Sequence, residues 1–455
     1  MHFNSLASAM VIMTLSNYCN FAWANNLAPS RTAQNPSIGI LIDPKMAYPK
    51  ATANFQAKST HKNKTRTPLV EKYLITGKLA DGETALITHL EQHSSDDQAR
   101  FGLGVLQFMR AIERLSQDLY RYGLRDSSTH GIAGPLLRLP VPHNPEPEIL
   151  TYWDGRTILD TFSKNILNAE ATLALITDPK VKLPLRFKII RLDLNGDGLA
   201  DDDESLWKVY ANVTDNRQMN ADQSKDFIVC FDRGDVHWLR GYCHLLATIC
   251  DVYLARDTKE TFDCTAHLFF AKVDSPYPFL NKGKHVHNIT SDDIDVLDLV
   301  ELIHSIRWTV VEPKRMELAL HHLEAVVAQS NESWKWIMAE TDDDHEWLPN
   351  PKQTGVIPNV RVTQEMIVTW TEIMNEIDKL LSGKLLVPFW RGDDDYGVNV
   401  RKVFLEPRTL DLILWVQGAA AAPYLQKGEL TDRKIWGRWR EVFGHNFPGF
   451  ALWFN

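Results

Sequence analysis

Apolar residues recur at intervals of three and four along most of the chain after residue 69, and this period constrains the fold more than any other feature. Such spacing gathers apolar side chains on one face of a helix. The segment 84–122 is predicted to be one amphipathic helix, in which the repeating residues are Phe101, Val105, Phe108, Ile112, Leu115 and Leu119. A Pro-rich stretch follows, and the period returns in Leu159, Phe162, Ile166, Ala169, Leu173 and Ile176. The sequence therefore predicts long amphipathic helices.

The same criteria predict further helices over 236–255, 259–271, 292–308, 313–339, 363–381 and 431–443. Short β-branched or aromatic runs predict a few strands, in FKIIRL, DFIVCF and VNVRKVF. We expect a mainly α fold, an irregular multi-helix bundle with a few short strands, in a helical domain over residues 69–455.

The N-terminal residues have the composition of an export signal. Residues 1–24 contain no Asp, Glu, Lys or Arg and end in Ala22, Trp23 and Ala24, a small-x-small triplet that suits a signal peptidase. We expect a signal peptide over 1–24 and a periplasmic or secreted protein. A membrane-anchored form is the alternative, because the segment lacks the usual basic residues and Asn17 interrupts its apolar run. Residues 25–68 are polar and aperiodic, which predicts a disordered tether.

Charge and hydropathy argue against nucleic acid as a partner and against a membrane-spanning helix in the mature chain. The chain has 49 Lys plus Arg and 58 Asp plus Glu, a formal net charge of -9, which argues against general nucleic-acid affinity. After the signal segment no stretch approaches the roughly 18 apolar residues of a membrane-spanning helix. The mature chain is therefore expected to have no transmembrane span.

The segment DLNGDGLADDDE has the ligand spacing of an EF-hand-type calcium loop. Positions 1, 3, 5, 7, 9 and 12 are Asp193, Asn195, Asp197, Leu199, Asp201 and Glu204. Ca²⁺ takes six to eight hard oxygen ligands, so side-chain oxygens, the carbonyl of Leu199 and a bidentate Glu204 are suitable, with Asp201 binding directly or through water. Position 6 is Gly198, where the chain must turn sharply. The sequence thus predicts one Ca²⁺ within 193–204.

The flanks of this loop differ from each other. After it, Leu206, Val209, Tyr210 and Val213 define one helical face. Before it, Pro184 and the run RFKIIRL favour an extended approach in place of an incoming helix. Because no second loop of this kind is visible and extracellular calcium is abundant, structural calcium is favoured over a sensor switch.

Four cysteines remain after signal removal, Cys230, Cys243, Cys250 and Cys264, and an exported chain could pair them. Cys243 and Cys250 lie seven residues apart on one predicted helix, a rise of about 10.5 Å, so they cannot bond each other. Any bridges would run to Cys230 and Cys264. Buried free thiols are the alternative.

Histidines and carboxylates form a stripe beside these cysteines. His237, His244 and Asp251 recur every seven residues, and Asp263 and His267 lie four apart on the next predicted helix. Two His and two carboxylates could bind Zn²⁺ or prepare a general base, with His285 and His287 as further ligands. Hydrogen-bonded structural histidines are the more common outcome. In the neighbouring tripeptide Arg233–Gly234–Asp235, we expect Asp235 to be a helix N-cap.

Four segments together resemble a group of exported bacterial proteins of unknown function: FGLGVLQFMRAIERL, LDLNGDGLADDDE, DRGDVHWLRGYCHLL and NFPGFALWFN. The resemblance covers most of the mature chain. It implies an exported protein whose one interpretable feature is the calcium loop, and it implies no reaction or substrate.

The sequence favours an exported calcium-binding protein with a binding or scaffold role, with an envelope protein or glycan as the partner class. The alternative is a metal-dependent or general-base hydrolase that uses the His/Asp stripe. Aromatic residues near the C-terminus could stack on sugars, but a buried closing seam explains them better: Trp436, Trp439, Phe450, Trp453 and Phe454.

Overall fold

The computed structural model describes residues 67–125, 139–206, 208–209, 228–280, 296–356, 361–391 and 395–443. The signal segment and almost all of the predicted tether lie outside these ranges, as do Tyr210, Val213, His285, His287, Phe450, Trp453 and Phe454.

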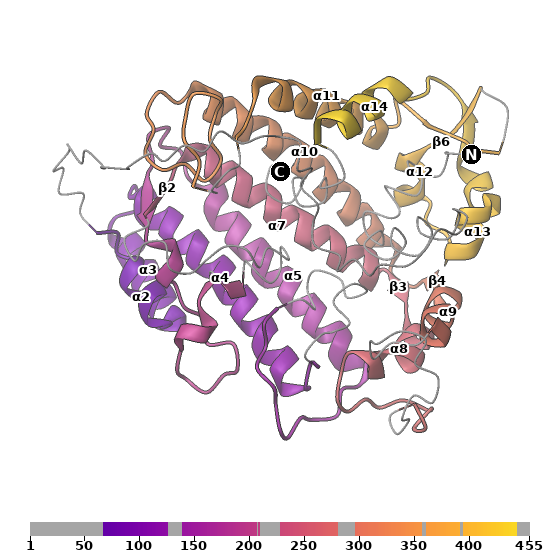
Figure 1. Cartoon of the computed structure of the whole chain (residues 1–455), viewed down its shortest axis with the longest axis horizontal. Helices are drawn as coiled ribbons and strands as arrows, with labels where there is room; N and C mark the ends of the chain where they lie inside the picture. Colours follow the sequence, from indigo (N-terminus) through magenta and orange to yellow (C-terminus); the bar gives the residue numbers. More distant parts are fainter. Residues whose placement is uncertain are drawn as a thin grey trace, which may run out of the picture.

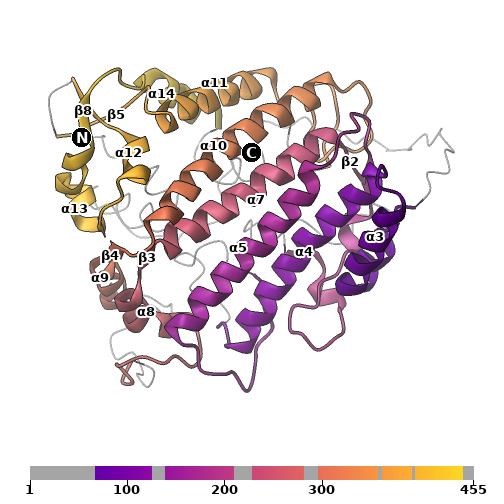
Figure 2. The same ribbon diagram turned by 180° about the vertical axis from the view of Figure 1, so that it is seen from behind.

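The chain folds as a mainly helical, irregular bundle, as the apolar period predicts (Figure 1). Its larger helices are α3 (Leu79–Gln92), α4 (Asp97–Arg121), α5 (Tyr152–Ala174), α7 (Arg233–Leu254), α10 (Pro313–Ala339), α11 (Gln364–Leu381) and α14 (Arg433–Phe443). They pack as a row in which each helix contacts the next in this order. Figure 2 shows α4, α5, α7 and α10 running side by side across the molecule. Within the described residues, no helix combines the length and apolar character needed to cross a membrane.

The shorter helical segments are α2 (Glu71–Thr76), η2 (Phe187–Ile189), η3 (Asp202–Glu204), α8 (Lys259–Thr265), η4 (Ala266–Leu268), α9 (Val296–Ser305), α12 (Val400–Leu405), α13 (Leu412–Gln417) and η5 (Ala419–Tyr424). The strands are also short: β1 (Leu183–Leu185), β2 (Val229–Phe231), β3 (Arg256–Asp257), β4 (Arg307–Val310), β5 (Val387–Pro388), β6 (Tyr396–Val398), β7 (Leu410–Asp411) and β8 (Leu425–Lys427). They pair antiparallel in the orders β1–β2, β3–β4–β7 and β5–β6–β8.

Capping residues in the sequence define where several helices begin. The Asp96 carboxylate accepts the backbone N–H of Ala99 at 2.9 Å, which separates α4 from α3. The expected single helix over 84–122 is therefore two helices. Thr151 begins α5 with a capping box, and Pro313 occupies the first turn of α10. Because these residues satisfy or avoid the free N–H groups of a first turn, they fix the residue at which each helix begins.

Two of the predicted strands are helical in part. FKIIRL contains the 3₁₀ helix η2, and the strand β1 lies just before it. In VNVRKVF, β6 ends at Val398 and the Asn399 side chain caps α12 by accepting the N–H of Lys402 at 3.1 Å. In both segments local hydrogen bonding overrides β propensity.

Helices α4 and α5 pack closely where they cross at Gly104. A Cβ added to Gly104 would lie 2.5 Å from Cδ2 of Leu173, a side chain with no exposed surface. Trp436 and Trp439 are buried against the same connected apolar cluster, which confirms a buried seam for these two aromatic residues.

Replacing Gly104 with alanine should destabilise the protein by about 1–3 kcal/mol, because the added methyl group must displace Leu173 from a filled core. The matched control is Gly155→Ala on α5, where the nearest atom to the new Cβ lies 4.0 Å away. That change should be neutral or stabilising by about 0.5–1 kcal/mol. Urea unfolding of both variants measures the difference, and equal effects would contradict this account of the crossing.

Candidate metal centre

The acidic loop 193–204 is bonded to α2 at its start, and its end is bonded to the segment that leads into it. The N–H of Arg191 donates to the carbonyl of Leu74 in α2 at 3.0 Å, and the N–H of Leu206 donates to the carbonyl of Ile190 at 2.8 Å. Leu192 and Leu194 have no exposed surface, so they anchor the start of the loop in the core. As expected, the chain approaches through β1 and η2 and not through a long helix. Leu206 and Val209, on the exit side, are helical and buried.

Helix α4 supports the first ligand position from behind. The Glu113 carboxylate accepts the N–H of Asp193 at 2.9 Å, and the Gln117 side chain donates to the Asp193 carbonyl at 2.8 Å. Burial raises the pKa of Glu113 to about 7, and the neighbouring Asp193 carboxylate adds to this shift. Glu113 and Gln117 are not predictable as loop partners from the sequence, because nothing in the local pattern links α4 to a segment about 80 residues further along.

Side chains within the loop hold its backbone in a turn. The two Asp193 carboxylate oxygens accept the N–H groups of Gly196 and Gly198, at 2.7 and 3.0 Å. Asn195 accepts the N–H of Asp197 at 2.9 Å, and Asp197 that of Leu199 at 2.8 Å. Gly198 has a φ of 83°, which confirms the sharp turn expected at position 6.

Glu204 turns its carboxylate into the loop from the opposite end. The residue is 5% exposed, and its two oxygens accept the N–H groups of Leu194 and Asp201 at 2.9 and 3.0 Å. Burial raises the pKa of Glu204, and the Asp193 and Asp197 carboxylates raise it further. Ionised Glu204 therefore carries a negative charge that is shielded from solvent and repelled by two other carboxylates.

Basic side chains near the loop pair with acids at other positions. Arg191 forms an ion pair with Asp202, and Lys208 with Asp203. Among the described residues, no Lys or Arg forms an ion pair with Asp193, Asp197, Asp201 or Glu204. The donor set, carboxylate and amide oxygens without a cationic partner, fits a hard divalent cation such as Ca²⁺.

The loop carboxylates are not the most tightly gathered acids in the protein. Within the described part of the chain, the group of three possible ligand side chains with all ligand atoms within 4.8 Å of one another is Asp232, Glu340 and Glu346. An ion in the 193–204 loop would have to draw its carboxylates closer together than they are here.

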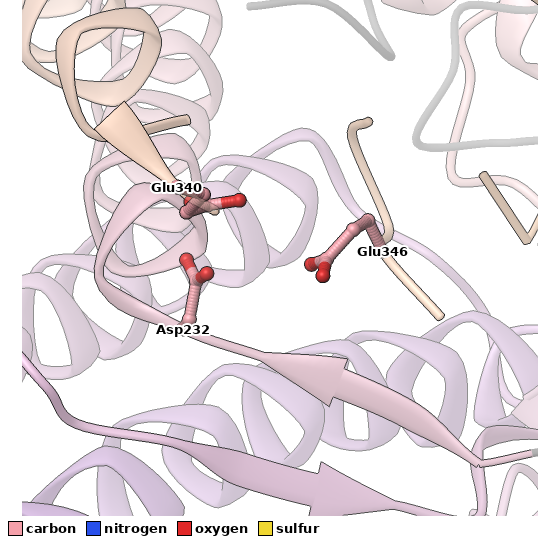
Figure 3. A group of neighbouring side chains, drawn as sticks. All are labelled: Asp232, Glu340 and Glu346. Atoms are coloured by element: carbon pink, nitrogen blue, oxygen red, sulfur yellow. The ribbon is translucent and has the colours of Figure 1, made fainter. Parts of the chain in front are cut away.

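Figure 3 shows the carboxyl groups of Asp232, Glu340 and Glu346 facing a common space between the start of α7 and the segment after α10. The nearby Lys182 is engaged with Asp342 and Asp344. Burial and the Asp232 carboxylate raise the pKa of Glu340 to about 10. Burial is also the main cause that raises the pKa of Glu346 to about 7. Burial and the Asp232 carboxylate therefore disfavour ionisation of Glu340 and Glu346.

Replacing Glu346 with glutamine should stabilise the protein near pH 7 by an amount on the order of 2 kcal/mol. A carboxyl group whose pKa is raised in the folded state contributes fully below its unfolded value of 4.5 and loses that contribution as the pH rises to about 7. Glutamine keeps an acceptor for the N–H of Asp344, which lies 3.0 Å from Glu346, but glutamine does not ionise.

Urea unfolding from pH 4 to 8 measures the effect. The control is Glu332→Gln, because Glu332 pairs with Lys335 at the surface. If Glu346→Gln left the pH dependence of the free energy of unfolding unchanged, the raised pKa of Glu346 would be wrong.

The structure does not join the His/Asp stripe into one site. His237 bonds to Gln329, Asp263 pairs with Lys259, and His267 is buried at η4. Of these residues, His244 and Asp251 enter a shared network whose other members come from α5 and α10. Within the described residues, no three members of the stripe form a compact ligand group.

Two smaller predictions also have clear outcomes. All four cysteines, Cys230, Cys243, Cys250 and Cys264, are free thiols, and burial raises the pKa of Cys230 to about 12. In the tripeptide 233–235 the predicted N-cap, Asp235, was wrong by three residues. Asp232 is the N-cap of α7, and Asp235 is the third helical residue that completes its capping box.

The chain matches no known family model, no curated protein sequence and no solved structure.

Proposed function

We propose that this protein is an exported calcium-binding protein, with one Ca²⁺ bound by Asp193, Asn195, Asp197, Leu199, Asp201 and Glu204. The observation that carries the proposal is a loop with EF-hand ligand spacing whose four carboxylates have no basic partner among the described residues. When bound, calcium supplies positive charge to carboxylates that burial and mutual repulsion otherwise disfavour.

The proposed role of calcium is structural. The loop lies between α4, which bonds Asp193 from behind, and α2, where Ala200 packs so closely that a Cβ on Gly77 would lie 2.3 Å from the Ala200 Cβ. Binding would therefore stabilise the contact between these helices. The support for export is the composition of residues 1–24, and an envelope protein or glycan is the proposed partner class for a binding or scaffold role. The hydrolase alternative has less support, because the stripe residues have separate partners.

Native mass spectrometry tests the site by counting the calcium ions bound to each protein molecule. The mature protein should retain one calcium ion, and the double variant Asp193→Ala, Glu204→Ala should retain none. The matched control is Asp202→Asn with Asp203→Asn, which changes two acids of the same loop at non-ligand positions. Equal calcium content in the ligand variant and the wild type would contradict the proposal.

A further inference from the structure

An open hollow of about 590 Å³ lies beside the three-stranded sheet β3–β4–β7. Its volume falls within the range of roughly 300–1,000 Å³ that is usual for small-molecule sites. Residues from β4, from the segment that ends in β7, from α13 and from η5 line it. The polar side chains of this lining are Arg307, Thr309, Arg408, Thr409 and Asp411.

Buried aromatic rings and prolines hold the wall of the hollow in place. The Tyr424 hydroxyl accepts the N–H of Arg408 at 3.1 Å and donates to the backbone carbonyl two residues earlier at 3.3 Å. The Tyr424 ring is buried and stacks on Trp415 of α13, with ring centroids 5.9 Å apart. Pro407 and Pro423 also line the hollow, and their rings fix the local φ angles. The shape of the wall is therefore set without a ligand.

Positive charge predominates among the polar side chains of the lining. Arg408 is exposed, and within the described part of the chain no carboxylate forms an ion pair with it. Arg307 is 73% exposed, and its Nε atom lies 3.9 Å from Asp411, too far for a hydrogen bond. The lining thus has two guanidinium groups and one carboxylate, in a chain whose formal net charge is -9.

A third guanidinium group is buried on the neighbouring strand. Arg256 of β3 pairs across the sheet with Val310, which lines the hollow, and Arg256 is 5% exposed. It donates to the Val252 carbonyl at 2.5 Å, but its Nε atom has no hydrogen-bond partner among the described residues. Burial lowers the pKa of Arg256 to about 10, so the group is charged at neutral pH. A buried cation without a carboxylate partner adds to the positive potential beside it.

The hollow also has an apolar side. Leu414 lines it and is 44% exposed, and its neighbours Ile413 and Val416 on α13 are exposed as well. A ligand that suits both sides has an anionic group for the arginines and an apolar part for α13.

We propose that this hollow binds a small amphipathic anion, with an oxyanion head group at Arg307 and Arg408 and an apolar body against Leu414. Guanidinium groups bind carboxylates and phosphates through paired hydrogen bonds, which fits either head group. The hydroxyl groups of Thr309 and Thr409 supply further hydrogen-bond donors. The proposal does not depend on the calcium loop.

Calorimetric titration of octanoate and of octyl phosphate into the full chain tests this proposal, with octanol as the uncharged comparison. At least one of the two anions should bind saturably with one equivalent, and octanol should bind at least about 10-fold more weakly. The relative affinities of the two anions then distinguish a carboxylate from a phosphate head group. Arg408→Gln and Arg307→Gln should each weaken binding by about 10-fold or more, because each removes a charged donor.

The matched control is Lys180→Gln, which removes the same charge from an exposed residue just before β1. β1 pairs with β2, and Figure 1 shows β2 and β4 on opposite sides of the molecule. This variant should bind the anions as the wild type does. An equal loss in Lys180→Gln would show a general effect of net charge and would overturn the proposal.

The arginine variants change exposed side chains, so their melting curves should match that of the wild type. Absence of saturable binding of both anions would overturn the proposal. Undiminished binding in the double variant Arg307→Gln, Arg408→Gln would overturn it as well, and so would equal affinity for octanol, since the apolar face of α13 would then explain binding without the arginines.

Discussion

Calcium should raise the midpoint of thermal unfolding, and the Asp193→Ala, Glu204→Ala variant should lose this response. A ligand that binds only the folded state stabilises it by about 2.7 kcal/mol at 100 times its Kd and by about 4.1 kcal/mol at 1,000 times. The physical basis is the position of the loop, whose first residue is bonded to α4 and whose Leu192 and Leu194 side chains lie in the core. Unfolding would release the ion together with these contacts.

Differential scanning calorimetry with calcium and with chelator measures this response. The control variant Asp202→Asn, Asp203→Asn should keep it, because these side chains are 89% exposed and pair with Arg191 and Lys208. If calcium binds tightly but leaves the midpoint of the wild type unchanged, the site exists and the proposed structural role of calcium is wrong.

The second large effect is expected from Arg315→Ala, which should lower the free energy of unfolding by about 3–5 kcal/mol. Arg315 on α10 donates to Asp160 on α5 at 2.7 Å and to Asp251 on α7 at 2.9 Å, so one guanidinium group joins three helices. Burial raises the pKa of Asp251, and Arg315 opposes that shift. Without the arginine, a carboxyl group with only 4% of its side chain exposed loses its cationic partner.

Chemical denaturation of Arg315→Ala is best compared with Lys335→Ala on the same helix. Lys335 is 67% exposed and pairs with Glu332 at the surface, so its loss should change stability by less than about 1 kcal/mol. Adding Asp251→Asn to Arg315→Ala should recover part of the loss, because the buried charge is removed with its partner. A loss below about 1 kcal/mol for Arg315→Ala alone would show that the pair is not important for stability.

The sequence predicted the long helices well where the apolar period and a cap agree. Pro313 is the first residue of α10 and Thr363 caps α11, and both helices span nearly the expected residues. The break between α3 and α4 falls in the polar residues 93–96, where Asp96 caps a new helix. The prediction extended one helix across this segment because periodic apolar residues lie on both sides of it. The β-branched run FKIIRL was misleading, since short-range hydrogen bonds form a 3₁₀ turn there.

For the candidate sites, contiguous ligands were predictable and tertiary partners were not. All six proposed calcium ligands lie within twelve residues, so spacing alone identifies them. Glu113 supports that loop from another helix, and His322 and Glu170 reach His244 from two more. A seven-residue spacing places His244 and Asp251 on one face of α7, but it cannot tell which helices cover that face.

Calorimetric titration of Ca²⁺ into the chelator-treated mature protein and into the Asp193→Ala, Glu204→Ala variant tests the central claim most directly. The account predicts saturable binding of one ion to the 193–204 loop in the wild type and no heat of binding at that site in the variant. Absence of binding to the wild type, or the same isotherm for both proteins, would show that 193–204 is an acidic loop that does not bind calcium.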